Sequence, residues 1–161
     1  MKETHMPESD RAKEIRRRSS SMSQSKRDFL NELVKENSLN VDEDIFKLAR
    51  GGKKIAIITR TGIEKIQYNN DIEVKFDPLV TEKDFAVIKA IATKEGIEGA
   101  IIYIETFGSA WHGQGGNCQN NYVAEMAEKR ALARAVLKLC GAYKHGVYGE
   151  DEADDFKKEN S

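Results

Sequence analysis

Two stretches of alternating residues, 85–93 and 100–107, constrain the fold of this chain more than any other feature. In the first stretch, one face carries Phe85, Val87, Lys89 and Ile91, and the other carries Ala86, Ile88, Ala90 and Ala92. A period of two residues is typical of a β-strand whose two faces meet different surroundings. Residues 94–96 (Lys-Glu-Gly) predict a hairpin between the two strands. With a third candidate strand over residues 72–76, the sequence predicts a β-meander of three or more antiparallel strands.

A long helix is predicted over residues 122–140, after a polar loop over residues 109–121. Four apolar residues recur at the spacing of one buried helix face, namely Leu132, Ala135, Val136 and Leu139. Gly141 is expected to end this helix, because glycine readily adopts the left-handed conformation found after helix C-termini. A meander packed on this helix predicts an α+β fold with a βββα core.

Shorter elements are expected before the meander. Ser25 is a candidate N-cap for a short helix, since Phe29, Leu30, Leu33 and Val34 follow it at helical spacing. Residues 54–58 are rich in branched side chains and predict a strand, after which Thr61 is expected to cap a helix over residues 62–68. A small apolar cluster is expected from Ile45, Phe46 and Leu48.

Charged residues are distributed unevenly, although 26 basic and 27 acidic side chains give a net charge of −1. Residues 1–27 hold eight basic and four acidic side chains, whereas residues 150–161 hold two basic and six acidic ones. We therefore expect a disordered basic tail over residues 1–24, one domain over residues 25–149 and an acidic C-terminal tail over residues 150–161. An attraction for polyanions must then come from a local cluster of cations.

The sequence predicts neither a membrane-spanning protein nor a secreted one. The sequence has no apolar run of about 18 residues and no apolar segment of a secretory signal near its N-terminus. Cys118 and Cys140 are too few for a disulfide framework, so free thiols in a reducing, cytoplasmic compartment are expected.

The sequence does not favour an enzyme, a metal site or a bound cofactor. It has no Gly-x-x-x-x-Gly-Lys-Ser/Thr motif to bind ATP phosphates. His112 and Cys118 are a conceivable nucleophilic pair, but no partner is evident to orient the histidine. A zinc site that adds Cys140 and His145 would lack a closely spaced cysteine pair. The acidic residues 42–44 are interpreted as a solvated turn rather than a two-metal nuclease site.

Three cations of the predicted helix form a basic ridge, consisting of Arg130, Arg134 and Lys138. Their spacing of four residues places them on one side, roughly opposite the apolar stripe. Ala127, Ala131 and Ala133 flank them, and we expect these small side chains to leave the ridge open to a polyanion. An ordinary solvated face is the alternative, since repulsion at this spacing costs only a few tenths of a kcal/mol.

The loop before this helix contains Trp111 and His112 among glycines, where aromatic rings and backbone N–H groups can approach a nucleic-acid strand. The alternative is that the single tryptophan packs in the core. Further candidate contacts are Lys53, Lys54 and Arg60, which are proposed from their charge alone. Lys89 is a candidate that lies either on the sheet face toward the nucleic-acid groove or only at its edge.

The stretch from Glu125 to Tyr143 resembles the helix of phage single-strand annealing proteins of the Erf type, which relate more loosely to the Rad-fifty-two recombination proteins. The matching residues are Glu125, Ala127, Glu128, Ala131, Arg134, Ala135, Gly141 and Tyr143. The sequence departs from the family pattern at Lys129, Ala133 and Cys140. With the βββα order, the resemblance spans roughly residues 50–145.

The resemblance implies ATP-independent binding of single-stranded DNA and annealing of complementary strands during recombination and repair in a bacterial host, encoded by a phage or mobile element. It implies a homo-oligomer, either a ring or a filament, with a basic groove in which Arg134 contacts phosphate. A single-strand-binding protein or an exonuclease is a further expected partner. Two alternatives stay open, namely a non-annealing nucleic-acid-binding module and a protein-interaction domain. The acidic tail is expected either to screen neighbouring protomers or to compete for the groove.

Overall fold

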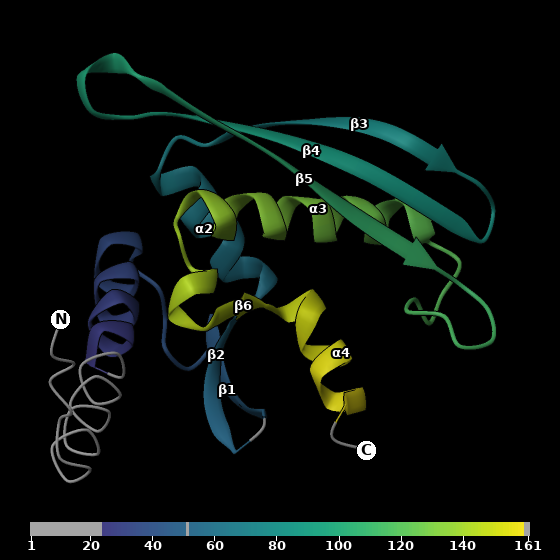
Figure 1. Ribbon diagram of the computed structural model, residues 1–161, viewed down its shortest axis with the longest axis horizontal. Helices are drawn as coiled ribbons and strands as arrows, with labels where there is room; N and C mark the ends of the chain where they lie inside the picture. Colours follow the sequence, from purple (N-terminus) through teal and green to yellow (C-terminus); the bar gives the residue numbers. More distant parts are fainter. Residues whose placement is uncertain (1–23, 51, 160–161) are drawn as a thin grey trace, which may run out of the picture.

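The computed structural model describes residues 24–50 and 52–159, so residues 1–23 of the expected basic tail lie outside the described part. The described chain is a mixed α+β protein, as predicted. Its elements are a helix over residues 24–37, β1 (Ile45–Arg50), β2 (Lys53–Ile58), α2 (Arg60–Asn69), β3 (Glu73–Thr81), β4 (Phe85–Glu95), β5 (Ile101–Trp111), α3 (Val123–Leu139), β6 (Val147–Gly149) and α4 (Glu150–Glu159). Figure 1 shows α3 between a sheet of β3, β4 and β5 and a smaller sheet of β1, β2 and β6.

The larger sheet is antiparallel, with β4 paired to β3 on one side and to β5 on the other. The alternation predicted for β4 is confirmed, because Ala86, Ala90 and Ala92 are fully buried while the other face is exposed or half-buried. β5 continues to Trp111, four residues beyond the predicted end of this strand. Residues 109–111 therefore belong to the sheet and not to the following loop.

α3 lies close against β5 because the contact is made by residues with little or no side chain. A Cβ atom at Gly108 would lie 2.1 Å from the carbonyl oxygen of Ala127 and 2.4 Å from the nitrogen of Ala131. The Thr106 hydroxyl donates a 3.0 Å hydrogen bond to the carbonyl oxygen of Ala131. The helix ends as predicted at Gly141, which has a φ of +68° in the left-handed region.

The smaller sheet contains one strand that was expected only as an apolar cluster and one that was not expected. Residues 45–50 form β1, antiparallel to β2, and residues 147–149 form β6, parallel to β2. β6 has only three residues, so no alternation is visible in its sequence. Helix α2 begins one residue after its N-cap Thr59, whose hydroxyl accepts a hydrogen bond from the Gly62 N–H. The prediction of Thr61 as this cap was wrong.

The C-terminal acidic segment is a helix packed on the smaller sheet rather than a free tail. In α4, Ala153 and Phe156 are buried and contact a cluster with Ile57. The ring of Phe156 meets that of Tyr148 edge-on, with 5.0 Å between centroids. Two apolar residues three positions apart thus give this charged helix a buried side.

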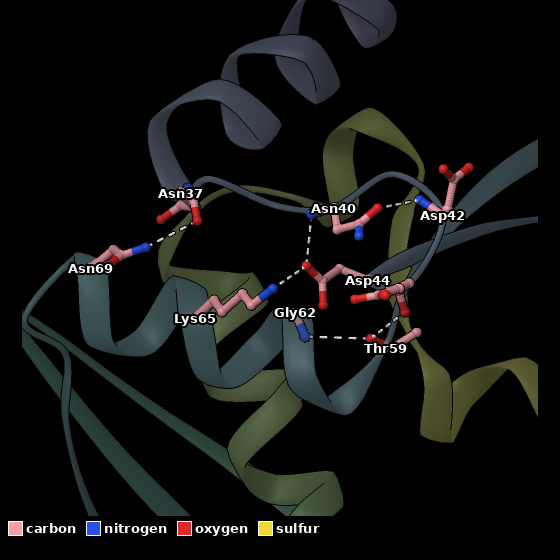
Figure 2. Close-up of polar contacts among 9 residues, drawn as sticks. Asn37, Asn40, Asp42, Asp44, Thr59, Gly62, Lys65 and Asn69 are labelled. Carbon is pink, nitrogen blue, oxygen red and sulfur yellow. Dashed lines mark hydrogen bonds and ion pairs between the residues drawn. The ribbon is translucent and has the colours of Figure 1, made fainter.

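A polar junction joins the loop before β1 to α2 (Figure 2). Asp44 is fully buried, and one of its carboxylate oxygens accepts hydrogen bonds from Lys65 Nζ at 2.6 Å and from the Asn40 N–H at 2.7 Å. Its other oxygen has no hydrogen-bond partner. The prediction of a solvated acidic turn was therefore wrong for Asp44, which lies in the interior.

Asparagine side chains extend this junction toward the end of the first helix. Asn37 is buried, and its backbone and side-chain oxygens accept hydrogen bonds from Asn69 at 3.0 Å and from Asn70 at 2.7 Å. Lys94 of β4 donates a 2.9 Å hydrogen bond to Asn70. At the other side of the first helix, Phe29 stacks on His145 with ring centroids 4.2 Å apart.

Candidate nucleic-acid interface

A cleft of about 300 Å³ runs between the end of β5, the predicted ridge of α3 and the acidic helix α4. Its lining residues are Phe107, Gly108, Ser109, Asn117, Arg130, Ala133, Arg134, Asp151, Glu152 and Asp155. The first two cations of the ridge therefore do share one depression with β5. The lining carries two guanidinium groups and three carboxylates, so the predicted basic groove is not uniformly positive.

The alanines beside the ridge do not form an open approach for a polyanion, and that expectation was wrong. Ala127 and Ala131 are fully buried against the sheet, and Ala133 is buried on the side of β6 and α4. α3 is covered on two sides, by the sheet of β3, β4 and β5 and by the smaller sheet of β1, β2 and β6 (Figure 1). The predicted stripe identified part of the buried surface, since Ala135 and Val136 are fully buried.

Arg130 holds the loop after β5 in place. Its guanidinium donates hydrogen bonds to the carbonyl oxygens of Ser109, at 2.8 Å, and Asn117, at 2.7 Å. Ser109 belongs to β5 and Asn117 to the loop, so one side chain joins three segments. A planar guanidinium has five N–H donors, and these two hydrogen bonds occupy two of them.

Arg134 is paired with α4. Its Nη1 atom lies 3.2 Å from Oε1 of Glu152, and 47% of the Arg134 side chain remains exposed. The second carboxylate oxygen of Glu152 accepts hydrogen bonds from the Tyr143 hydroxyl and from the Gly149 N–H, each at 3.1 Å. Glu152 thus fixes the first turn of α4 to the ridge.

Asp151 adds a second carboxylate, and its pKa is raised. Burial raises its pKa above the usual value, and the neighbouring Glu150 adds to this effect, while Arg130 opposes it. Burial, reinforced by the charge of Glu152, also raises the pKa of the Tyr143 hydroxyl, which therefore stays a hydrogen-bond donor at neutral pH.

Lys138 is exposed one turn beyond Arg134 and does not line the cleft. It lies in the last turn of α3, where a positive charge is favourable to the helix dipole. Two of the three ridge cations, Arg130 and Arg134, therefore line the cleft, and Lys138 does not.

The other predicted cations lie elsewhere. Lys53 and Lys54 are exposed at the start of β2, and Arg60 is exposed at the start of α2, where it pairs with Glu64 at 3.0 Å. Lys89 lies on the outer face of the larger sheet, across which it contacts carboxylates of both neighbouring strands. The structure does not bring these four cations into the cleft.

Lys89 is enclosed by acidic groups. Its Nζ atom lies 3.4 Å from Glu105 and 3.8 Å from Asp77. The hydrogen bond from the Tyr103 hydroxyl lowers the pKa of Glu105, and the charge of Lys89 adds to this effect. Lys89 is therefore already paired with two carboxylates and is not free to bind phosphate.

Trp111 lies at the end of β5, directly opposite Phe85 of β4, and 48% of its surface is exposed. The alternative that this tryptophan packs in the core is therefore wrong. Phe107, on the same face of β5, is 52% exposed and lines the rim of the cleft. The alternating pattern of β5 indicated that these aromatic residues share a face. It did not indicate that this face is left uncovered by the other elements of the described chain.

His112 and Cys118 lie together, although not as a nucleophilic pair. The His112 ring nitrogen Nδ1 contacts the carbonyl oxygen of Cys118 at 3.2 Å, while the thiol of Cys118 lies 3.1 Å from the carbonyl oxygen of Asn120. Cys140 and His145 lie at the other end of α3, so the four residues do not form one site. In the described part of the chain, no three His, Cys, Asp or Glu side chains are grouped as metal ligands.

The comparisons with known proteins assign no family. Scans of the sequence against protein-family models and against curated proteins both give no match. Among the described residues, no helix has the length and apolar character needed to span a membrane.

Proposed function

We propose that this protein binds single-stranded DNA in the cleft between β5, α3 and α4, and that it anneals complementary strands without ATP. The observation that carries the proposal is that Arg130 and Arg134 line one cleft whose rim holds the exposed ring of Phe107. Guanidinium groups bind phosphate irrespective of sequence, and aromatic rings stack on any base.

The sequence resemblance supports the same proposal. The β3–β5 meander followed by α3 has the chain order of the βββα core of single-strand annealing proteins, and Arg134 occupies the position matched to them. We propose a homo-oligomer in the bacterial cytoplasm, in which the modest attraction of each cleft is multiplied along one strand. A single-strand-binding protein or an exonuclease is the proposed partner in recombination.

The cations of the ridge can be tested by replacing Arg134 and Lys138 with alanine. The double variant is expected to bind single-stranded oligonucleotides at least about tenfold more weakly at low salt, because it loses Arg134 inside the cleft and the exposed cation Lys138 one helical turn beyond it. The dependence of affinity on salt concentration should also become shallower. A matched control replaces Lys53 and Lys54, which carry the same charge away from the cleft. Unchanged binding by the first variant contradicts the proposal.

Annealing distinguishes the proposed function from a module that only binds DNA. Pairing of complementary strands should be accelerated equally with and without ATP and magnesium. Binding without acceleration would favour a non-annealing accessory protein. A protein-interaction domain is the second candidate, because the outer sheet face exposes Phe85, Phe107 and Trp111 without a covering element in the described chain. Absence of salt-dependent DNA binding would favour that candidate.

The carboxylates of α4 are proposed to compete with DNA for the arginines. Replacing Asp151 and Asp155 with asparagine removes two negative charges from the cleft and should strengthen single-strand binding several-fold at low salt. The gain should vanish at high salt, because screening weakens exposed charges. Asp42→Asn with Asp71→Asn changes net charge equally away from the cleft and serves as the control. An equal gain in both pairs would show that only total charge matters.

A further inference from the structure

β5 is an edge strand of the larger sheet. Within the described residues, its hydrogen-bonded neighbour in the sheet is β4, and no strand pairs with its other side. The opposite edge of the sheet, β3, carries Pro78 and a bulge between Pro78 and Val80. Proline and bulges obstruct pairing with another strand. β5 has neither, so it is the edge at which a further strand can be added.

The direction of the free backbone groups follows from the hydrogen bonds at the end of β5. The Trp111 N–H donates to the Asn117 side chain at 2.8 Å, and the Trp111 carbonyl accepts from the Cys118 N–H at 3.0 Å. The Ser109 carbonyl accepts from Arg130. Backbone groups alternate in direction along a strand, so the odd-numbered residues of β5 point away from β4. The loop and Arg130 cover the edge at residues 109–111, which leaves residues 101–107 open.

We propose that the open edge pairs with the same edge of a second copy, antiparallel and centred on Ile104. This register places Ile101 opposite the partner's Phe107 and Tyr103 opposite the partner's Glu105. Every odd-numbered residue from 101 to 107 then exchanges hydrogen bonds with the partner strand. The result is one continuous six-stranded sheet with two-fold symmetry.

The side chains disfavour the neighbouring register that is centred on Glu105. A shift that places Glu105 opposite its own copy would bring two carboxylates together, which is unfavourable. The register centred on Ile104 instead places each Glu105 opposite the partner's Tyr103, whose hydroxyl already donates a hydrogen bond to Glu105 of its own chain. It also makes Ile101 the cross-strand neighbour of the partner's Phe107, and these side chains are 67% and 52% exposed in the single chain. The complementarity is therefore both polar and apolar.

This inference deepens the self-association in the proposed function by naming its surface and register. It is tested without DNA, so failure of the dimer leaves DNA binding by the cleft to its own assays. Loss of DNA binding likewise leaves the sheet pairing standing. Because the pairing is symmetric, it closes on itself, and a larger ring or filament must use this dimer as its unit.

Cysteine cross-linking tests the register directly. Two copies of Ile104 face each other in a non-hydrogen-bonded pair with Cα atoms about 4.5 Å apart, within the range of a disulfide. Ile104→Cys should therefore form a covalent dimer under mild oxidation of the native chain. Ile102→Cys faces the partner's Thr106 and should not. Oxidised wild type controls for Cys118 and Cys140. Absent cross-linking at residue 104, or equal cross-linking at 102, overturns the proposed register.

Charge changes at residue 103 test the same contact without an oxidant. Tyr103→Glu places a carboxylate opposite the partner's Glu105 twice per dimer and should weaken association about tenfold. Tyr103→Lys has a similar size but places a cation there, and it should retain the dimer. Tyr103 is exposed, so both variants are expected to fold, which circular dichroism checks. Sedimentation that shows a monomeric wild type, or equal association of both variants, overturns the proposal.

Discussion

Gly108→Ala is expected to lower the free energy of unfolding by roughly 3 kcal/mol or more, a large part of the total for a domain of this size. The added methyl group would meet the carbonyl oxygen of Ala127 at 2.1 Å and the nitrogen of Ala131 at 2.4 Å. Both atoms belong to the backbone of α3 and cannot rotate away, so the helix would have to move from β5. Urea unfolding followed by circular dichroism measures the loss.

Gly149→Ala is the matched control for this substitution. A Cβ atom there would lie 3.5 Å from side-chain carbons of Ala133 and Leu137, which is ordinary van der Waals contact. We expect its unfolding midpoint to stay close to that of the wild type. If Gly108→Ala were equally harmless, α3 could not approach β5 as closely as the structure shows.

Sequence periodicity predicted β4 well, because the two faces of this strand meet different surroundings, but it placed the ends of β3 and β5 several residues too early. In β4 the inner residues are small and buried, and the outer ones are larger and partly exposed, so a period of two is strong. α3 was predicted at nearly its observed length for the same reason. Its lateral contacts were not predicted, because a helix between two layers buries alanines on more than one side. The small alanine side chains of α3 were interpreted as space for a ligand, whereas in the structure they pack against neighbouring elements.

The candidate site was predicted only in part, because the acidic composition of residues 150–159 did not indicate α4, the helix that forms one side of the cleft. Residues 150–159 are dominated by acidic side chains, which favoured a solvated tail. The spacing of Ala153 and Phe156 was the available signal for a helix with one buried side. Charge counts likewise identified Arg130 and Arg134 but not their partners, since pairing with Glu152 or with backbone carbonyls depends on the tertiary fold.

Asp44→Ala is expected to lower the free energy of unfolding by about 3 kcal/mol at neutral pH. The substitution removes the acceptor of the Lys65 ammonium and of the Asn40 N–H, and it leaves a cavity beside α2. Lys65 is 38% exposed and can turn toward water, which keeps the loss at the lower end for a buried pair. Thermal unfolding measures the change. A loss no greater than that of exposed Asp42→Ala would contradict a structural role for the junction.

The pH dependence of stability provides a separate test of Asp44. Burial would raise the pKa of this carboxyl, but the hydrogen bonds from Lys65 and Asn40 and the positive charge of Lys65 together lower it. A lowered pKa in the folded state means that the unfolded chain binds the proton more readily. The stabilisation is therefore complete above about pH 4 and is lost as the pH falls through the folded-state pKa. Asp44→Asn should flatten the acid limb of the wild-type stability curve. An equally steep acid limb in Asp44→Asn would show that this carboxyl gains no ionic stabilisation from Lys65.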